Sequence, residues 1–185
     1  MRAFPLLLAA IGVAACRSGT GAATAAGTDA RTERATAAAR ASGERRTEQC
    51  VVRRVADGDT LTCADGTRVR LIGIDSPERS QAEGFASARA ALLRLAPIGD
   101  AVRLERDVVP TDQYGRRLAW VWSGDRLLNE VLVRDGWAVL YTVPPNVRYT
   151  ERIALAQRQA RAASAGLWAT NGFDCLPRDR RRGNC

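Results

Sequence analysis

One short segment, residues 55–78, gathers most of the side chains in this sequence that are suited to chemistry. Four of its carboxylates and one embedded arginine stand near the ends of the predicted strands, namely Asp57, Asp59, Asp75, Glu78 and Arg70. Carboxylates bind hard cations and accept protons, and the guanidinium of arginine pairs with anions. The combination indicates a functional site, although each acid taken singly is more typical of a turn or a helix cap.

The absence of histidine narrows the chemistry that such a site can perform. The chain has 28 Lys+Arg, all of them arginine, 20 Asp+Glu and no His, for a net charge of +8. Without imidazole, Ser-His and Cys-His hydrolases are excluded, as are nucleases that use histidine as base or metal ligand. Any hydrolysis here must therefore use carboxylates, arginine and a metal. The positive charge favours polyanions, with nucleic acid first and an anionic membrane surface second.

The same segment predicts the strands and turns that position these groups. Asp57-Gly58 and Asp65-Gly66 are both typical of tight hairpin turns, in which glycine tolerates positive φ. In a regular strand Arg70 and Asp75 would face opposite sides of the sheet. Their convergence requires a bend, and Gly73 is the natural place for it.

The rest of the folded part predicts further strands and about three helices. A capping-box pattern, Ser80 to Glu83, starts a helix that Pro97 ends. Strands follow at residues 101–106 and 117–122, then a helix at 128–135. Thr150 is expected to cap a last helix with Ala163 on its inner face and Gly166 at its end. This order predicts an α+β fold, a small five-stranded β-barrel of the OB type.

The two ends of the chain have different compositions from its centre. Residues 1–16 are expected to be a signal peptide whose end resembles a lipobox, with Cys16 lipidated; the alternative is a plain signal peptide cut near Ala15. Either way we expect an exported protein. Residues 17–48 are predicted to be a disordered Ala/Thr/Arg-rich tether. The folded domain is expected at 49–170, followed by a basic, cysteine-containing tail at 171–185. Within that tail the run Arg178 to Arg182 is most simply a solvated basic end.

Four cysteines remain when Cys16 is set aside, which predicts two disulfides in an exported chain. Zinc is disfavoured because the spacings lack close CxxC pairs. Of three pairings, proximity in sequence favours Cys50–Cys63 and Cys175–Cys185. The first of these does not fit a simple hairpin register around the Asp57–Asp59 turn.

Three motifs together resemble the staphylococcal nuclease (thermonuclease-like) family. They read DGDTL, VRLIGIDSPE and DQYGRRLAWVW, and the resemblance extends over about Cys50 to Trp168. It implies one Ca²⁺ held by the side chains of Asp59 and Asp75 and by the backbone carbonyl of Ser76.

The resemblance also implies the remaining roles at the site. Glu78 would be the general base, Arg70 and Arg116 the arginines that bind phosphate and act in catalysis, and Tyr114 a nucleotide contact. The implied activity is Ca²⁺-dependent hydrolysis of DNA and RNA that leaves 3′-phosphate ends. The alternatives are a non-catalytic OB-type nucleic-acid-binding module and an envelope lipoprotein that only meets lipid head groups. We expect a monomer that touches the membrane only through its lipid.

Overall fold

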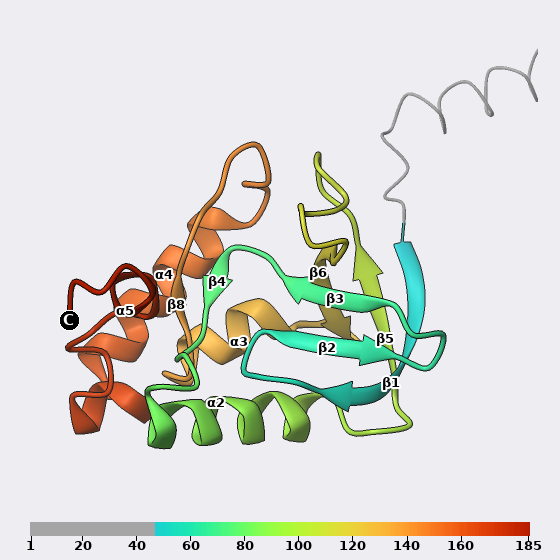
Figure 1. Cartoon of the computed structure of the whole chain (residues 1–185). Helices are drawn as coiled ribbons and strands as arrows, with labels where there is room; N and C mark the ends of the chain where they lie inside the picture. The colour runs from blue at the N-terminus through green and yellow to red at the C-terminus, as the bar shows by residue number, and fades with distance from the viewer. Residues whose placement is uncertain (1–46) are drawn as a thin grey trace, which may run out of the picture. The chain divides into compact units, whose positions relative to one another are not determined.

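The structure is a computed structural model that describes residues 47–185 (Figure 1). The predicted signal peptide, Cys16 and all but the last two residues of the predicted tether lie outside the described residues. The first strand begins at Thr47, within the segment that composition assigned to the tether. Among residues 47–185, no helix is both long and apolar enough to cross a membrane.

Five strands close into a barrel, which confirms the predicted OB-type architecture. They are β1 (Thr47–Val55), β2 (Thr60–Cys63), β3 (Arg68–Leu71), β5 (Ala101–Glu105) and β6 (Arg117–Ser123). β1 pairs antiparallel with β2 and β5, β2 with β3, and β5 with β6. A parallel pairing of β3 with β6 then closes the barrel. Closure leaves these strands without the exposed edges of an open sheet.

Shorter strands and several helices complete the described part of the chain. The strands are β4 (Ile74–Asp75), which pairs with β8 (Val139–Leu140), and β7 (Arg126–Leu127), which extends β6. The helices are α2 (Ala82–Leu95), α3 (Leu128–Arg134), α4 (Thr150–Ala162), the 3₁₀ helix η1 (Gly166–Thr170) and α5 (Pro177–Arg181). Figure 1 shows α2 running along one side of the barrel and α5 beside the end of the chain.

The core lies inside the barrel and between it and the helices. Its largest fully buried side chains include Trp120, Leu61, Leu71, Leu104 and Leu132. The inward residues of β1 alternate with exposed ones, as expected for a strand with one face in water. β6 is buried over four successive residues because it lies between β5 and β3.

Both disulfides favoured by sequence proximity are present. Cys50–Cys63 has an S–S distance of 2.04 Å and Cys175–Cys185 one of 2.05 Å. The register problem for the first pair is solved by a bulge in β1, where the pairing shifts between Val52 and Arg54 and sets Cys63 opposite Val52. Cys63 is thereby moved toward Cys50, and both sulfur-bearing side chains are buried.

Three local predictions about the helix ends are wrong. The Ser80–Glu83 capping box does not form: Gln81 is the N-cap residue of α2, and no side chain caps it. Thr150 is the first residue of α4, not its cap, and Ala163 is exposed beyond the end of the helix. In both helices the tertiary contacts of the preceding loop decide the entry geometry, which a capping pattern does not contain.

Candidate active-site cleft

The bend at Gly73 brings Arg70 of β3 next to Asp75 of β4. Gly73 has φ of +76° between β3 and β4, and a Cβ there would lie 2.6 Å from the Trp120 ring. Only glycine satisfies both conditions. Beyond the bend, Arg70 Nη2 donates to the carbonyl of Ile74 at 2.9 Å and lies 3.3 Å from Asp75 Oδ1. The bend at Gly73, which strand parity required if Arg70 and Asp75 were to meet, is therefore confirmed.

The turn before β2 delivers the second carboxylate to the same arginine. Asp59 Oδ2 lies 3.3 Å from Arg70 Nη2 and accepts the backbone N–H of Ser76 at 2.7 Å. Gly58 lets this turn approach α2, since a Cβ there would be 2.6 Å from that of Ala88. Gly58 is thus needed because a larger residue would not fit. Positive φ was expected of both turn glycines, but Gly66 has it and Gly58 does not.

Two carboxylates of this group, Asp57 and Asp75, are held in surroundings that raise their pKa. Asp59 and Asp75 are 6% and 1% exposed. Burial raises the pKa of Asp75, and the negative charge of Asp59 adds to the rise. Burial and the same neighbour raise the pKa of Asp57 to about 6. Asp57 also accepts the Asp59 N–H at 3.1 Å, as expected of a residue that shapes the turn. The pocket therefore favours a compensating positive charge.

Glu78 lies at the rim of this group, where an arginine from the far end of the chain meets it. Arg181 of α5 pairs with Glu78 Oε1 and also with Asp75, at 2.8 Å between Nη2 and Oδ2. Hydrogen bonds to Asp75 raise the pKa of Arg181 above its ordinary value. The basic tail is predicted to be solvated, and the Arg181 side chain is indeed 41% exposed, but it also pairs with carboxylates of the site.

A loop before β6 forms the opposite wall and carries the other predicted residues. Asp112 holds this loop together: its carboxylate accepts the backbone N–H groups of Tyr114 and Arg116 at 2.9 Å and pairs with Arg116 Nε at 2.7 Å. Tyr114 is 64% exposed, and its ring lies 5.6 Å from the Arg116 guanidinium carbon. Arg116 therefore pairs with a loop acid, not with Asp59 or Asp75.

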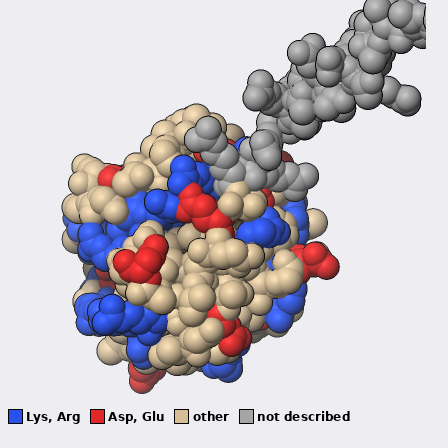
Figure 2. Space-filling model, turned by 90° about the vertical axis from the view of Figure 1, so that its right-hand side faces the viewer, with Lys and Arg blue, Asp and Glu red and all other residues tan. Residues whose placement is uncertain are grey.

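Both walls line one cleft of about 990 Å³. Asp59, Arg70, Asp75 and Glu78 lie on the barrel side, Tyr114 and Arg116 on the loop side, and Tyr141 and Arg181 also contribute. The structure thus brings Asp59, Asp75 and Arg70 into contact, with Ser76 beside them. It places Tyr114 and Arg116 across the cleft. Figure 2 shows a different face of the molecule, where basic side chains alternate with acidic and uncharged ones.

The donor set fits a hard cation such as Ca²⁺. Two buried carboxylates lie side by side, and their anionic oxygens are paired with Arg70 and Arg181. Oxygen ligands of this kind suit calcium, which completes its shell with water. Within residues 47–185 no three His, Cys, Asp or Glu side chains are grouped as metal ligands, so carbonyls, water or substrate would have to supply the rest.

Sequence reasoning missed Arg181 as a part of the site. Its partner Asp75 is 106 residues away, and no local pattern links a C-terminal Arg run to a strand end. The available signal was the Cys175–Cys185 pair, which marks this tail as a closed, folded loop rather than a free end.

Comparisons with known proteins agree with the site and the fold. The family model described as "Staphylococcal nuclease homologue" matches residues 68–170. The chain is 38% identical to the thermonuclease of Staphylococcus intermedius over 136 residues, which cover 70% of this chain and 81% of that protein. It is 36% identical to the thermonuclease of Staphylococcus hyicus, covering 63% and 73%. An uncharacterized endonuclease of Haemophilus influenzae is 36% identical, covering 66% and 67%. This chain belongs to the staphylococcal nuclease family.

Proposed function

We propose that the protein is a nuclease that hydrolyses phosphodiester bonds of DNA and RNA with the help of Ca²⁺ and leaves 3′-phosphate ends. The observation that carries this proposal is the pair of buried carboxylates, Asp59 and Asp75, both 3.3 Å from Arg70 Nη2. Their burial is costly for the fold unless cations compensate them. Membership of the staphylococcal nuclease family and the names of the thermonuclease relatives support the same reaction.

Asp59 and Asp75 would hold the metal ion, together with the carbonyl of Ser76. Calcium, when bound, supplies positive charge that neutralises a phosphate and orients an attacking water. The two side chains are already oriented without it. Asp59 is fixed by the N–H of Ser76 and Asp75 by Arg70. Such preorganisation lowers the cost of assembling the site when substrate arrives.

The two arginines differ in how they would meet the phosphate. Arg70 is anchored by its bond to the Ile74 carbonyl, so it presents a fixed charge beside the carboxylates. Arg116 pairs with Asp112 through Nε, which orients its guanidinium on the loop wall. Charge that builds on the phosphate during attack would be stabilised by both guanidinium groups. Tyr114, exposed beside Arg116, would contact the nucleotide.

Glu78 would take the proton from the attacking water. Its position fits this role because it lines the cleft and yet is not buried with Asp59 and Asp75. A carboxylate at the rim keeps access to water, which a general base requires.

We further propose that the protein is an exported monomer anchored through lipidated Cys16. The two disulfides support export, because such bonds persist in oxidising compartments. Mass spectrometry of the mature protein should find an acylated Cys16 at its N-terminus. A free N-terminus at any other residue would contradict the lipid anchor.

Digestion of DNA and RNA with calcium or with chelator tests the main proposal. We expect cleavage only with calcium, and terminal analysis should find 3′-phosphate on the products. The rival proposal, a non-catalytic binding module, predicts that nucleic acid is bound and remains intact in both conditions. An envelope lipoprotein that meets only lipid head groups would neither bind nor cleave it.

A further inference from the structure

The C-terminal helix α5 sets an arginine directly on the carboxylates of the cleft. Arg181 Nη1 and Nη2 lie 3.1 and 2.8 Å from Oδ1 and Oδ2 of Asp75, and Nη1 also contacts Glu78. The Asp75 side chain is 2% exposed, whereas that of Arg181 is 41% exposed. The guanidinium therefore approaches a buried carboxylate from the solvent side and occupies both of its oxygens.

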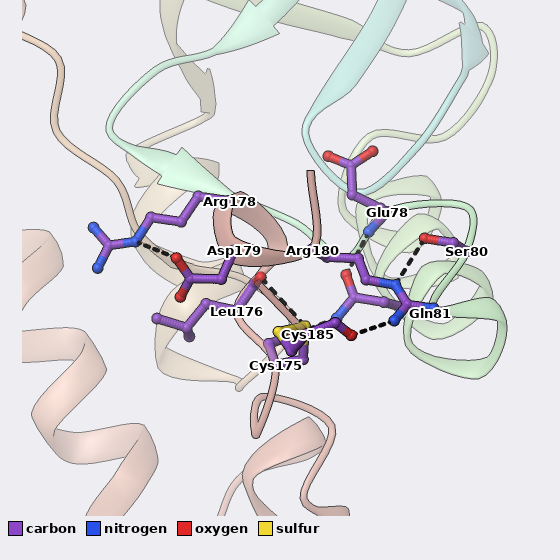
Figure 3. The surroundings of a disulfide bond; sticks show 9 residues. All are labelled: Glu78, Ser80, Gln81, Cys175, Leu176, Arg178, Asp179, Arg180 and Cys185. Carbon is purple, nitrogen blue, oxygen red and sulfur yellow. Dashed lines mark hydrogen bonds and ion pairs between the residues drawn. A yellow bond between two sulfur atoms is a disulfide. The ribbon is translucent and has the colours of Figure 1, made fainter. Parts of the chain in front are cut away.

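The tail that carries Arg181 is fastened to the loop that carries Glu78 through the surroundings of a disulfide (Figure 3). The disulfide Cys175–Cys185 closes the tail around α5. Gln81 then ties the tail to the loop of the site: its Nε2 donates to the Cys175 carbonyl at 2.8 Å, and its Oε1 accepts the Glu78 N–H at 2.9 Å. Arg180 adds bonds to Ser80 and to the Cys185 carbonyl. The segment that carries Glu78 and the segment that carries Arg181 thus form one bonded unit.

Arg181 differs from the other arginine on Asp75 in its freedom to leave. Arg70 belongs to a barrel strand, its side chain is 13% exposed, and it is bonded to the Ile74 carbonyl. Arg181 lies on a helix of five residues near the end of the chain and is half-exposed. Movement of Arg181 breaks its contacts with Asp75 and Glu78 and disturbs the short tail, while movement of Arg70 would disrupt the barrel.

A metal ion and Arg181 cannot both be close partners of Asp75 without cost. A divalent cation held by this carboxylate would stand within a few ångströms of the guanidinium, and like charges at that separation repel strongly where water is scarce. We propose that Arg181 is an internal counter-ion that competes with calcium for Asp75, so that the tail sets the calcium concentration at which the site fills. This inference rests on the calcium site proposed above.

The expected effect is moderate because Arg181 is partly in water. A charge-assisted pair with a buried carboxylate is worth more than a surface ion pair, and exposure reduces it. Calcium can bind only to the molecules in which Arg181 has left Asp75. Its apparent affinity is therefore reduced in proportion to the fraction of such molecules. Removal of the side chain should therefore tighten calcium binding about tenfold.

Calorimetric titration of calcium into the purified protein without nucleic acid tests the competition. Arg181→Ala should bind about tenfold more tightly than the parent, and Arg181→Lys should fall between them because it keeps the charge and loses the fork. Arg178→Ala is the matched control, since it removes an equal charge from the same helix at a residue that pairs only with Asp179 among the ion pairs found in residues 47–185. Equal affinity of the parent and Arg181→Ala would overturn the proposal.

Hydrogen exchange of the unaltered protein gives a second readout that needs no variant. The amides of Asp179 and Arg180 donate to the Leu176 carbonyl within α5. Calcium should speed their exchange if it expels Arg181, and unchanged exchange at saturating calcium would overturn the proposal. Tighter binding by Arg181→Ala in a protein that cleaves nothing would uphold the competition and refute the nuclease. If the parent protein cleaves nucleic acid but binds calcium as tightly as Arg181→Ala does, the nuclease is upheld and the competition is refuted.

Discussion

The two walls of the cleft are built by different means. The barrel wall carries Asp59, Arg70 and Asp75 on strands and tight turns; the two carboxylates are buried, and Asp59 and Arg70 are bonded to backbone groups. The loop wall carries the exposed Tyr114 and the half-buried Arg116, which is held by a local ion pair with Asp112. Buried, multiply bonded groups keep one geometry, whereas exposed pairs exchange with water and ligands. The geometry of Asp59, Arg70 and Asp75 is therefore more rigid than that of the side chains on the loop.

The largest effect that this comparison predicts is on the rate. Glu78→Gln keeps the size of the side chain and removes its basicity, so turnover at saturating calcium should fall by roughly 10²–10⁴. Glu83→Gln is the matched control, an exposed acid in the first turn of α2. Rates of DNA hydrolysis and circular dichroism of both variants make the test. Turnover of Glu78→Gln close to that of the control would remove Glu78 from the role of base.

The next effect is on the stability of the barrel wall. Gly73→Ala places a Cβ against the Trp120 ring at a backbone position whose positive φ is strained for alanine. The free energy of unfolding should therefore fall by about 2–4 kcal/mol. Gly99→Ala has a similar φ of +93° with nothing within 4 Å of the added Cβ, and about 1 kcal/mol is expected. Urea unfolding measures both. Equal losses would show that backbone strain alone, and not the Trp120 contact, fixes the bend.

The smallest effect concerns the loop wall and depends on pH. Burial by itself raises the pKa of Asp112, but hydrogen bonds from Arg116 and Tyr114 outweigh it and lower that pKa below its ordinary value of 3.8. A lowered pKa stabilises the fold above the ordinary value, and this contribution is lost as the pH falls below it. Asp112→Asn should therefore cost about 0.5–1 kcal/mol at pH 7 and less near pH 3.

Urea unfolding of the parent and of Asp112→Asn at the two pH values measures this contribution. A difference that persists unchanged at the lower pH would contradict the role of the charge. Hydrogen bonds that asparagine also makes would then be what holds the loop.

Sequence reasoning succeeded where a local pattern and the tertiary structure demand the same thing. The parity of Arg70 and Asp75 required a bend, and Gly73 was the residue able to make it. It failed where distant contacts decide. The Ser80–Glu83 pattern does not cap α2, because the preceding loop is bonded through Gln81 to the Cys175 carbonyl instead.

The tail shows the same limit at the site itself. A run of arginines near a chain end is ordinarily solvated, and nothing in its composition points to a carboxylate 106 residues away. The disulfide Cys175–Cys185, which proximity did favour, encloses the helix α5 that carries this run to the cleft. Knowledge of the covalent loop was not enough to predict the partner of Arg181.

The central claim is that the buried carboxylates hold the metal ion that hydrolysis requires. Calorimetric calcium binding and DNA hydrolysis should be measured on Asp59→Asn and on Asp125→Asn, an exposed acid in the turn between β6 and β7. We predict that Asp59→Asn weakens calcium binding by roughly 10–100-fold or more and that hydrolysis falls with it, while Asp125→Asn matches the parent in both. Parent-like calcium affinity and turnover in a folded Asp59→Asn protein would contradict the account.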